Sequence, residues 1–317
     1  MVTRETKIGV AFAIISNFIG GFQPVWANMR PVGLDSHVFS AMSCLFQALI
    51  FLPIFLIEFR YNKDKRKNLN IEAELLKKPQ YRLFFGKSKW GLFLVVGTLF
   101  SLVMFLYYYG LALAGSINGT LGVKTTAIFG LVYGFLLLKE DISKIQVIFS
   151  IVLFFGMIIA VTQGAFQLLQ LNIGVIIILI CSSVWMLGHT ASKPYLYFGI
   201  TTPSELLVVR NAISSAVLIG AYLILFGPQI IIIFIPEYAF SYIIMAAIYG
   251  SNLFCWYQIL KYLDVSIGTI LITPQIIVTA IFGTLLLQES FTIFHLIGLI
   301  IMCASIVIIN YKPMSKK

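Results

Sequence analysis

The chain contains 317 residues, of which 60% are hydrophobic and 11% are charged, and its net charge is +10 at pH 7. Soluble domains are about 45–50% apolar and about 25% charged, so the composition excludes a globular protein surrounded only by water. In lipid every backbone N–H and C=O must be bonded internally, and uninterrupted apolar runs of about 20 residues favour helices over barrel strands, which predicts an all-α membrane protein.

Ten membrane-spanning helices are predicted along the chain. The first, at 8–27, is not followed by a small-residue cleavage site, so we expect a retained span and not a signal peptide. The others are expected at 38–57, 90–113, 117–138, 145–162, 171–191, 206–226, 240–260, 265–287 and 291–310. Two short segments are expected outside the spans: 68–78 as a surface helix and the apolar stretch 230–235 at the membrane interface.

The basic residues are distributed unevenly between the loops. With a cytoplasmic N-terminus, 19 of the 22 Lys and Arg residues fall in inner segments, mostly in the loop 58–89, and only Arg30 falls in an outer loop. The positive-inside rule therefore predicts that both termini are cytoplasmic, and we expect the cell membrane as the location. The same loop explains most of the net charge as a topology signal that can also touch anionic lipid, so no nucleic-acid partner is expected.

Two blocks of the chain match at a constant offset of 149 residues. Ten of 33 positions are identical between Tyr108–Glu140 and Tyr257–Glu289, including tyrosine, glycine, threonine and glutamate. Five spans in each half would give the halves opposite orientations, which predicts two inverted five-helix repeats at 1–165 and 166–317. Inverted repeats are typical of secondary transporters, which expose a site near the bilayer midplane to alternate sides.

These blocks resemble the drug/metabolite transporter superfamily, of the EamA-like kind. The matching residues of the second half are Tyr257, Lys261, Tyr262, Pro274, Gly283, Leu285, Leu286, Leu287, Glu289 and Gly298; those of the first half are Leu136, Leu137, Leu138, Lys139 and Glu140. Ser182, Ser183, Val184, Trp185 and Arg210 also stand where that family often has a tryptophan in span six and an arginine in span seven.

The resemblance implies transport of a small solute through a central cavity. That cavity would be lined by spans one to four and six to nine, with spans five and ten at the periphery. The sequence departs from the family pattern at Phe18, near Met42 where span two lacks an arginine, and at Thr125, which replaces the proline matched by Pro274.

Lys124 is the strongest candidate for solute binding. It lies near the middle of span four, where an ionised lysine costs roughly 2.5–3.5 kcal/mol. We expect it to face a wet cavity and bind an anion; the alternative is an amine satisfied by backbone or hydroxyl partners such as Thr125. Arg210 lies about a turn and a half into span seven from the cytoplasmic side, where it is expected either to contact the solute or to act as a clamp near the inner gate, with Glu205 as a plausible partner.

No Asp or Glu lies deep in a predicted span, which favours a solute with a carboxylate or phosphate over a cation. His189 is the only other deep titratable group, and it is expected either to relay protons or to pack as a hydrogen-bonded group. Aromatic and amide side chains add further candidates, of which Tyr108 and Tyr257 are matched between the repeats. The predicted binding residues are Lys124, Tyr108, Tyr257, Trp185, His189, Gln23, Asn118, Trp256, Gln275 and Arg210.

These features predict a secondary transporter that moves a small organic metabolite, with an amino acid or other carboxylate-bearing solute favoured, by alternating access. The alternatives are an exchanger of phosphorylated solutes, such as sugar phosphates or nucleotide sugars, and a transporter of cationic or drug-like amphiphiles. No HExxH, GxSxG or paired intramembrane aspartates are present, and the four cysteines form no CxxC pair, so we expect no enzyme activity, metal or cofactor. A monomer or a homodimer is expected.

Overall fold

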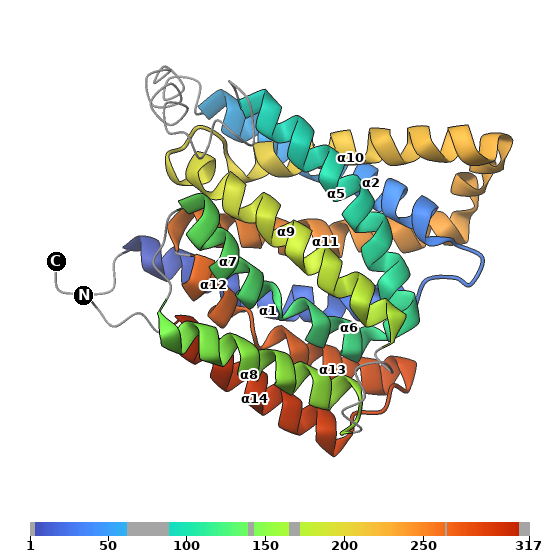
Figure 1. Cartoon of the computed structure of the whole chain (residues 1–317). Coiled ribbons are helices and arrows are strands. Elements are labelled where there is room, and N and C mark those ends of the chain that lie inside the picture. Colours follow the sequence, from blue (N-terminus) through green and yellow to red (C-terminus); the bar gives the residue numbers. More distant parts are fainter. Residues whose placement is uncertain (1–3, 62–88, 139–142, 165–171, 264, 311–317) are drawn as a thin grey trace.

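The computed structural model describes residues 4–61, 89–138, 143–164, 172–263 and 265–310, and these residues form a bundle of helices without strands (Figure 1). The predicted surface helix 68–78 and most of the basic loop 58–89 lie outside the described residues. The helices are α1 (Arg4–Asn28), α2 (Ser36–Tyr61), α5 (Lys89–Ala114), α6 (Ser116–Val123), α7 (Thr126–Leu138), α8 (Lys144–Val161), α9 (Ile173–Tyr197), α10 (Pro203–Phe226), α11 (Pro236–Tyr262), α12 (Val265–Leu271), α13 (Gln275–Leu287) and α14 (Ile293–Asn310).

The prediction of an all-α, ten-span membrane protein is confirmed. Eight segments are long and apolar enough to cross a bilayer, with α6 and α7 counted as one segment. The shorter apolar helices α13, which α12 precedes, and α14 complete the ten. The apolar stretch at 230–235 lies largely within a 3₁₀-helix, Gly227–Phe234, between α10 and α11, where Ile231 is 68% exposed and Phe234 is 77% exposed.

Spans four and nine each consist of two helices separated by a short break. In span nine α12 ends at Leu271 and α13 begins at Gln275, directly after Pro274, which has no N–H to donate to the preceding turn. In span four the Thr125 hydroxyl donates to the Gly122 carbonyl at 2.7 Å. Such a bond competes with the regular helical ladder, and α6 gives way to α7 at this point.

The two broken spans have the same architecture in the two halves. The first residues of α6 and α12, at positions 116 and 265, are 149 apart, as are the first residues of α7 and α13, at 126 and 275, and their last residues, at 138 and 287. The sequence offset between the repeats is therefore also an offset between helix boundaries.

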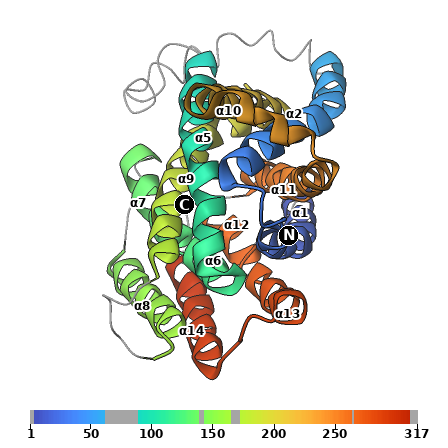
Figure 2. The ribbon, with the colours of Figure 1, turned by 90° about the vertical axis from the view of Figure 1, so that its right-hand side faces the viewer.

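The packing of the helices follows the same symmetry. α1 packs against α11 and α13, while its counterpart α9 packs against α5 and α7. α2 packs against α10 at one end of the molecule, and α8 packs against α14 at the other (Figures 1 and 2). The family resemblance is therefore right that spans five and ten lie at the periphery.

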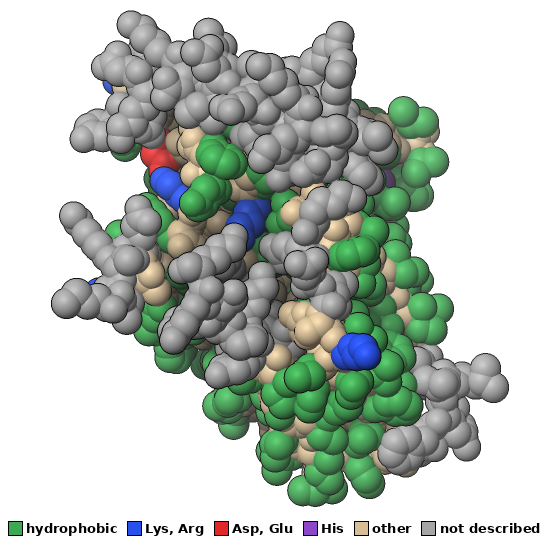
Figure 3. Space-filling view, turned by 60° about the vertical axis from the view of Figure 1, so that its left-hand side comes forward, with side chains coloured by type: hydrophobic (Ala, Val, Ile, Leu, Met, Phe, Trp, Pro, Cys, Tyr) green, Lys and Arg blue, Asp and Glu red, His purple; other side chains and the backbone are tan. Residues whose placement is uncertain are grey.

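Two glycines bring α8 and α14 into close contact. A Cβ atom on Gly298 would lie 2.4 Å from the Gly156 carbonyl oxygen, and one on Gly156 would lie 2.8 Å from Cγ2 of Ile301. Small residues allow such close approach in membrane bundles, where helix association depends on packing. The rest of α8 presents apolar side chains outward, with Ile148 56% exposed, and hydrophobic side chains cover much of the described surface in Figure 3. This surface suits contact with lipid.

Candidate functional site

A cavity of about 110 Å³ lies in the middle of the bundle, between the two halves. It is lined by residues of α1, α5, α6 and the start of α7 from the first half, and by residues of α9, α11, α12 and the start of α13 from the second. These elements are repeat counterparts of one another. No residue of α2 or α10 lines the cavity within the described ranges, so spans two and seven do not contribute to it here, contrary to the expectation from the resemblance.

Six of the predicted binding residues line this cavity. They come from both halves of the chain, and are Gln23, Lys124, Trp185, His189, Trp256 and Gln275.

Lys124 lies at the break between α6 and α7 and reaches across to the break in the other half. Its Nζ donates to the backbone oxygen of Ile272 at 2.9 Å and to Oε1 of Gln275 at 3.0 Å. The carbonyls at the end of a helix have no intrahelical partner and carry partial negative charge. Lys124 therefore caps the end of α12, and it joins the two broken spans where they meet.

Asn17 of α1 supports the same break, because its Nδ2 donates to the Leu271 carbonyl at 2.8 Å. The expected hydroxyl partner of Lys124, Thr125, instead bonds to Gly122 within its own turn.

A second polar group of the cavity connects α1, α11 and α13. Nε2 of Gln275 donates to the backbone oxygen of Ser16 at 3.1 Å, and the Ser16 hydroxyl donates to Oδ1 of Asn252 at 2.7 Å. A Cβ atom on Gly20 would lie 2.3 Å from Nε2 of Gln275 and 2.6 Å from Oδ1 of Asn252. A side chain at position 20 would therefore displace this network.

Aromatic rings form another wall of the cavity. The rings of Tyr107 and Trp185 are 4.6 Å apart, and the Tyr107 hydroxyl accepts a hydrogen bond from Nε2 of Gln23 at 3.3 Å. The ring of His189 is 5.8 Å from that of Trp256. In the described structure Nε1 of Trp185, Nε1 of Trp256 and Nδ1 of His189 are buried and have no hydrogen-bond partner. Buried polar groups are normally bonded, so these three nitrogens are exceptions among the described residues.

The structure places Arg210 outside the cavity. It is fully buried on α10, its Nη1 donates to the Tyr257 hydroxyl at 3.1 Å, and its Nη2 donates to Oδ1 of Asn211 at 2.8 Å. Tyr257 is turned toward Arg210 and does not line the cavity either. The expectation that these two residues contact the solute is therefore not met by this geometry.

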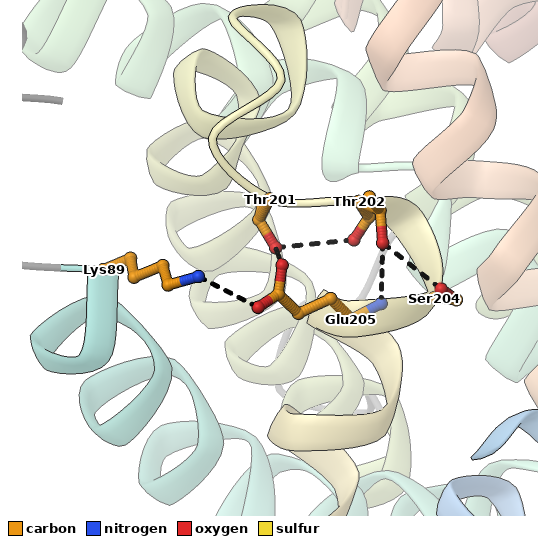
Figure 4. A network of polar contacts seen from close by, with 5 residues as sticks. All are labelled: Lys89, Thr201, Thr202, Ser204 and Glu205. Atoms are coloured by element: carbon orange, nitrogen blue, oxygen red, sulfur yellow. Dashed lines mark hydrogen bonds and ion pairs between the residues drawn. The ribbon is translucent and has the colours of Figure 1, made fainter. Parts of the chain in front are cut away.

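The expected pairing of Arg210 with Glu205 is wrong. Glu205 lies in the first turn of α10, where Oε1 pairs with Lys89 at 3.0 Å and Oε2 accepts from the Thr201 hydroxyl at 3.1 Å (Figure 4). Its backbone N–H donates to the Thr202 side chain, which caps the helix. These contacts join the start of α5 to the turn between α9 and α10.

Two further predicted residues lie away from the cavity. Tyr108 is fully buried against Phe39, with ring centroids 4.8 Å apart, and its hydroxyl has no partner among the described residues. Asn118 bonds through Oδ1 to Nε2 of His295 on α14 at 3.1 Å. Asn118 lies two residues before Thr120, which lines the cavity. Because two residues turn a helix by about 200°, Asn118 faces away from the cavity.

Glu289 caps the start of α6 from the other repeat. Its two carboxylate oxygens accept from the backbone N–H groups of Ser116 at 2.6 Å and Ile117 at 2.8 Å. The matching Glu140 lies outside the described residues. A carboxylate at a helix N-terminus satisfies free N–H groups and complements the helix dipole, so this contact holds one end of the half-helix against the opposite repeat.

Several lining residues were not predicted. Ser16, Gly20 and Pro24 follow one face of α1 together with the predicted Gln23, and Tyr249 and Leu253 follow one face of α11 together with the predicted Trp256. Their spacing of three or four residues is that of a helix face. Polar residues at this spacing within an apolar span were the signal that could have identified Ser16 and Tyr249.

The model of the EamA-like transporter family matches residues 7–162 and 172–311. No curated protein matches the chain in sequence. One crystal structure of a protein with 13% identical residues superposes with a TM-score of 0.62, covering 96% of this chain and 95% of its own. That likeness concerns the fold.

Proposed function

The chain belongs to the EamA-like transporter family, whose members carry small solutes across membranes, and we propose that its solute is a small metabolite with a carboxylate, an amino acid being the favoured class. The observation that carries this proposal is the position of Lys124 at the cavity wall. A lysine ammonium has three donors, and the protein uses two of them, for Ile272 and Gln275. The third is available to a bound carboxylate.

The charge of the cavity supports the same class of solute. Lys124 is its only lysine or arginine, and no Asp or Glu lines it within the described residues. A phosphate monoester carries about two negative charges at neutral pH, which two or more basic groups would match better than one. A cationic solute would lack a counter-ion. The exchanger of phosphorylated solutes and the transporter of cationic amphiphiles are thus less well supported.

The size of the cavity also favours a small solute. Its volume of about 110 Å³ is well below the roughly 300–1,000 Å³ of sites for drug-sized ligands. A nucleotide sugar or a drug-like amphiphile would need a much larger space. The unpartnered Trp185 and Trp256 N–H groups can donate to carboxylate oxygens, and the indole faces can receive an ammonium group through cation–π contact.

Alternating access would arise from an exchange of shape between the repeats. The breaks in spans four and nine divide each into two half-helices that meet at the cavity. Movement of half-helices about these breaks would open one side of the cavity while closing the other. We also infer, from the basic residues, that both termini are cytoplasmic.

Purified protein in liposomes tests the proposal by counterflow of amino acids, other carboxylates and sugar phosphates. Lys124→Gln retains a donor for the Ile272 carbonyl but removes the charge. Because hydrogen bonds to charged groups contribute about 1.5–3 kcal/mol, the affinity for a carboxylate should fall about tenfold to a hundredfold. The matched control is Lys144→Ala, at an exposed position at the start of α8, and wild-type transport is expected. Unchanged transport of every substrate by Lys124→Gln and Lys124→Ala would refute the binding role.

A further inference from the structure

We propose that Arg210 makes the cavity selective for anions by its electric field, from a position one layer of side chains behind the cavity wall and without touching the solute. This inference rests on the proposed carboxylate-bearing substrate. In this role Arg210 acts through its charge. It neither contacts the solute nor clamps the helices near the inner gate.

The charge of Arg210 has no counter-ion among the described residues. Its guanidinium donates to the oxygens of Tyr257 and Asn211, and Asn211 in turn donates to Oε1 of Gln47 at 3.0 Å. All three are neutral groups. No carboxylate lies within ion-pair distance of Arg210 in the described part of the chain, and the acid nearest to it in sequence, Glu205, is paired with Lys89.

Arg210 has no exposed surface, and an arginine does not lose its proton in proteins. The side chain therefore keeps a full positive charge inside the bundle. A buried charge without a partner is expensive, and an apolar side chain could join α10 to its neighbours at a lower cost.

Arg210 lies close to the cavity wall. The guanidinium carbon lies 4.4 Å from the ring centroid of Phe100 and 6.0 Å from that of Tyr257. The ring of His189 lies 5.4 Å from that of Phe100 and 5.7 Å from that of Tyr257. Because His189 lines the cavity, the two rings that Arg210 contacts are direct neighbours of a side chain in the cavity wall.

Aromatic rings transmit the field of a charge, since they hold no mobile ions or water to screen it. A unit charge acting across roughly 10 Å at an effective dielectric constant near 20 changes a binding equilibrium by about tenfold. A carboxylate in the cavity would thus gain affinity from Arg210 in addition to Lys124, whereas a neutral solute of the same shape would not.

The test compares an amino acid with its carboxamide, which has nearly the same shape but lacks the negative charge. The measured quantity is the ratio of the two affinities in competition for transport by liposomes. In Arg210→Gln, and in Arg210→Met as a second neutral replacement should the first not fold, we expect the carboxylate preference to fall about tenfold. In Arg210→Lys, which keeps the charge, we expect most of the preference to remain.

The matched control is Asn211→Ala, which removes the main hydrogen-bond partner of Arg210 but keeps its charge. It should lower stability and leave the affinity ratio unchanged. An unchanged ratio in the folded neutral variant, or an equal loss in Asn211→Ala, would overturn the role of the field. If the wild type shows no preference for the carboxylate, the proposed substrate class fails. If the wild type shows the preference and only Lys124 variants remove it, the inference about Arg210 alone fails.

Discussion

At the scale of single residues, the geometry of Lys124 is compatible with both roles that the sequence presented as alternatives. Its amine is satisfied by a backbone carbonyl and an amide of the opposite repeat, and it also lines the cavity with one donor to spare. The cost of placing a lysine deep in a membrane is thereby offset before any solute binds. A solute then competes with no existing contact of this side chain.

The unpartnered indole nitrogens lead to a prediction about Trp185 and Trp256. Replacing either residue with phenylalanine removes an N–H group and retains most of the ring. Carboxylate affinity in equilibrium binding should fall about tenfold, since hydrogen bonds to charged groups contribute about 1.5–3 kcal/mol. Thermal stability without solute should stay close to that of the wild type, because neither nitrogen has a partner in the described protein.

Trp90→Phe is the control for this prediction, because Trp90 is 57% exposed near the start of α5. Wild-type affinity in both cavity variants would show that the indole nitrogens do not contact the solute.

The two matched tyrosines show where reasoning from the sequence repeat ends. Tyr108 and Tyr257 are equivalent in sequence, and this predicted a shared role. Tyr257 receives a hydrogen bond from Arg210, whereas the Tyr108 hydroxyl has no described partner. Span two has no arginine near Met42, so the first half lacks the group that orients the tyrosine in the second.

At the scale of helices, the run lengths and the positions of most spans could be predicted because an apolar segment must be long enough to cross the bilayer. Of the two breaks, the one in span nine could be predicted better than the one in span four. Pro274 is a visible signal in span nine, but the break at Lys124 and Thr125 depends on a side-chain bond to Gly122 and on contacts with the distant Ile272. The polar lining could be predicted only in part, since the choice between two faces of α6 depends on tertiary packing.

The close contact between α8 and α14 gives a prediction at this scale. Gly298→Leu would drive a side chain into the Gly156 carbonyl, and overpacking of this kind costs about 1–3 kcal/mol. Denaturant unfolding in detergent should therefore show a loss of that size. The carboxylate preference should not change, because neither α8 nor α14 lines the cavity in the described structure.

Gly220→Leu on α10 is the matched control, because a Cβ atom on Gly220 would meet no atom within 4 Å. Equal stability of the Gly298 and Gly220 variants would contradict the tight interface.

At the scale of the whole molecule, the repeats hold each other through the broken helices. Glu289 of the second half caps α6 of the first, and Lys124 of the first half caps α12 of the second. Each contact would change if one half moved against the other. In the proposed alternating-access cycle, the two caps would therefore contribute to the energy difference between the access states.

Glu289→Gln tests the first of these contacts. Loss of an N-terminal cap costs about 0.5–2 kcal/mol, which should shift the equilibrium between access states by several-fold toward the state in which α6 is released. A cysteine at Thr120, in the cavity and in a background without the native cysteines, should then react faster with an impermeant maleimide added at the membrane side of Glu289.

The control is Glu237→Gln, at an exposed position in the first turn of α11. Labelling at the wild-type rate in Glu289→Gln would mean that the cap does not take part in access.

The difference between the two breaks has a kinetic consequence. Lys124 crosses to the opposite break, whereas Thr273, its counterpart in the repeat, donates to the Thr269 carbonyl within its own half. If the halves exchange shapes as proposed, Thr273 cannot replace the contact that Lys124 makes with the opposite break. The inward-facing and outward-facing forms would then differ in free energy. Detailed balance still requires an uncoupled carrier to have the same ratio of maximal rate to half-saturating concentration in both directions. Such a carrier reaches half-saturation at different solute concentrations on its two sides, and its maximal net transport rates differ between the two directions. The gradients alone determine where the solute accumulates.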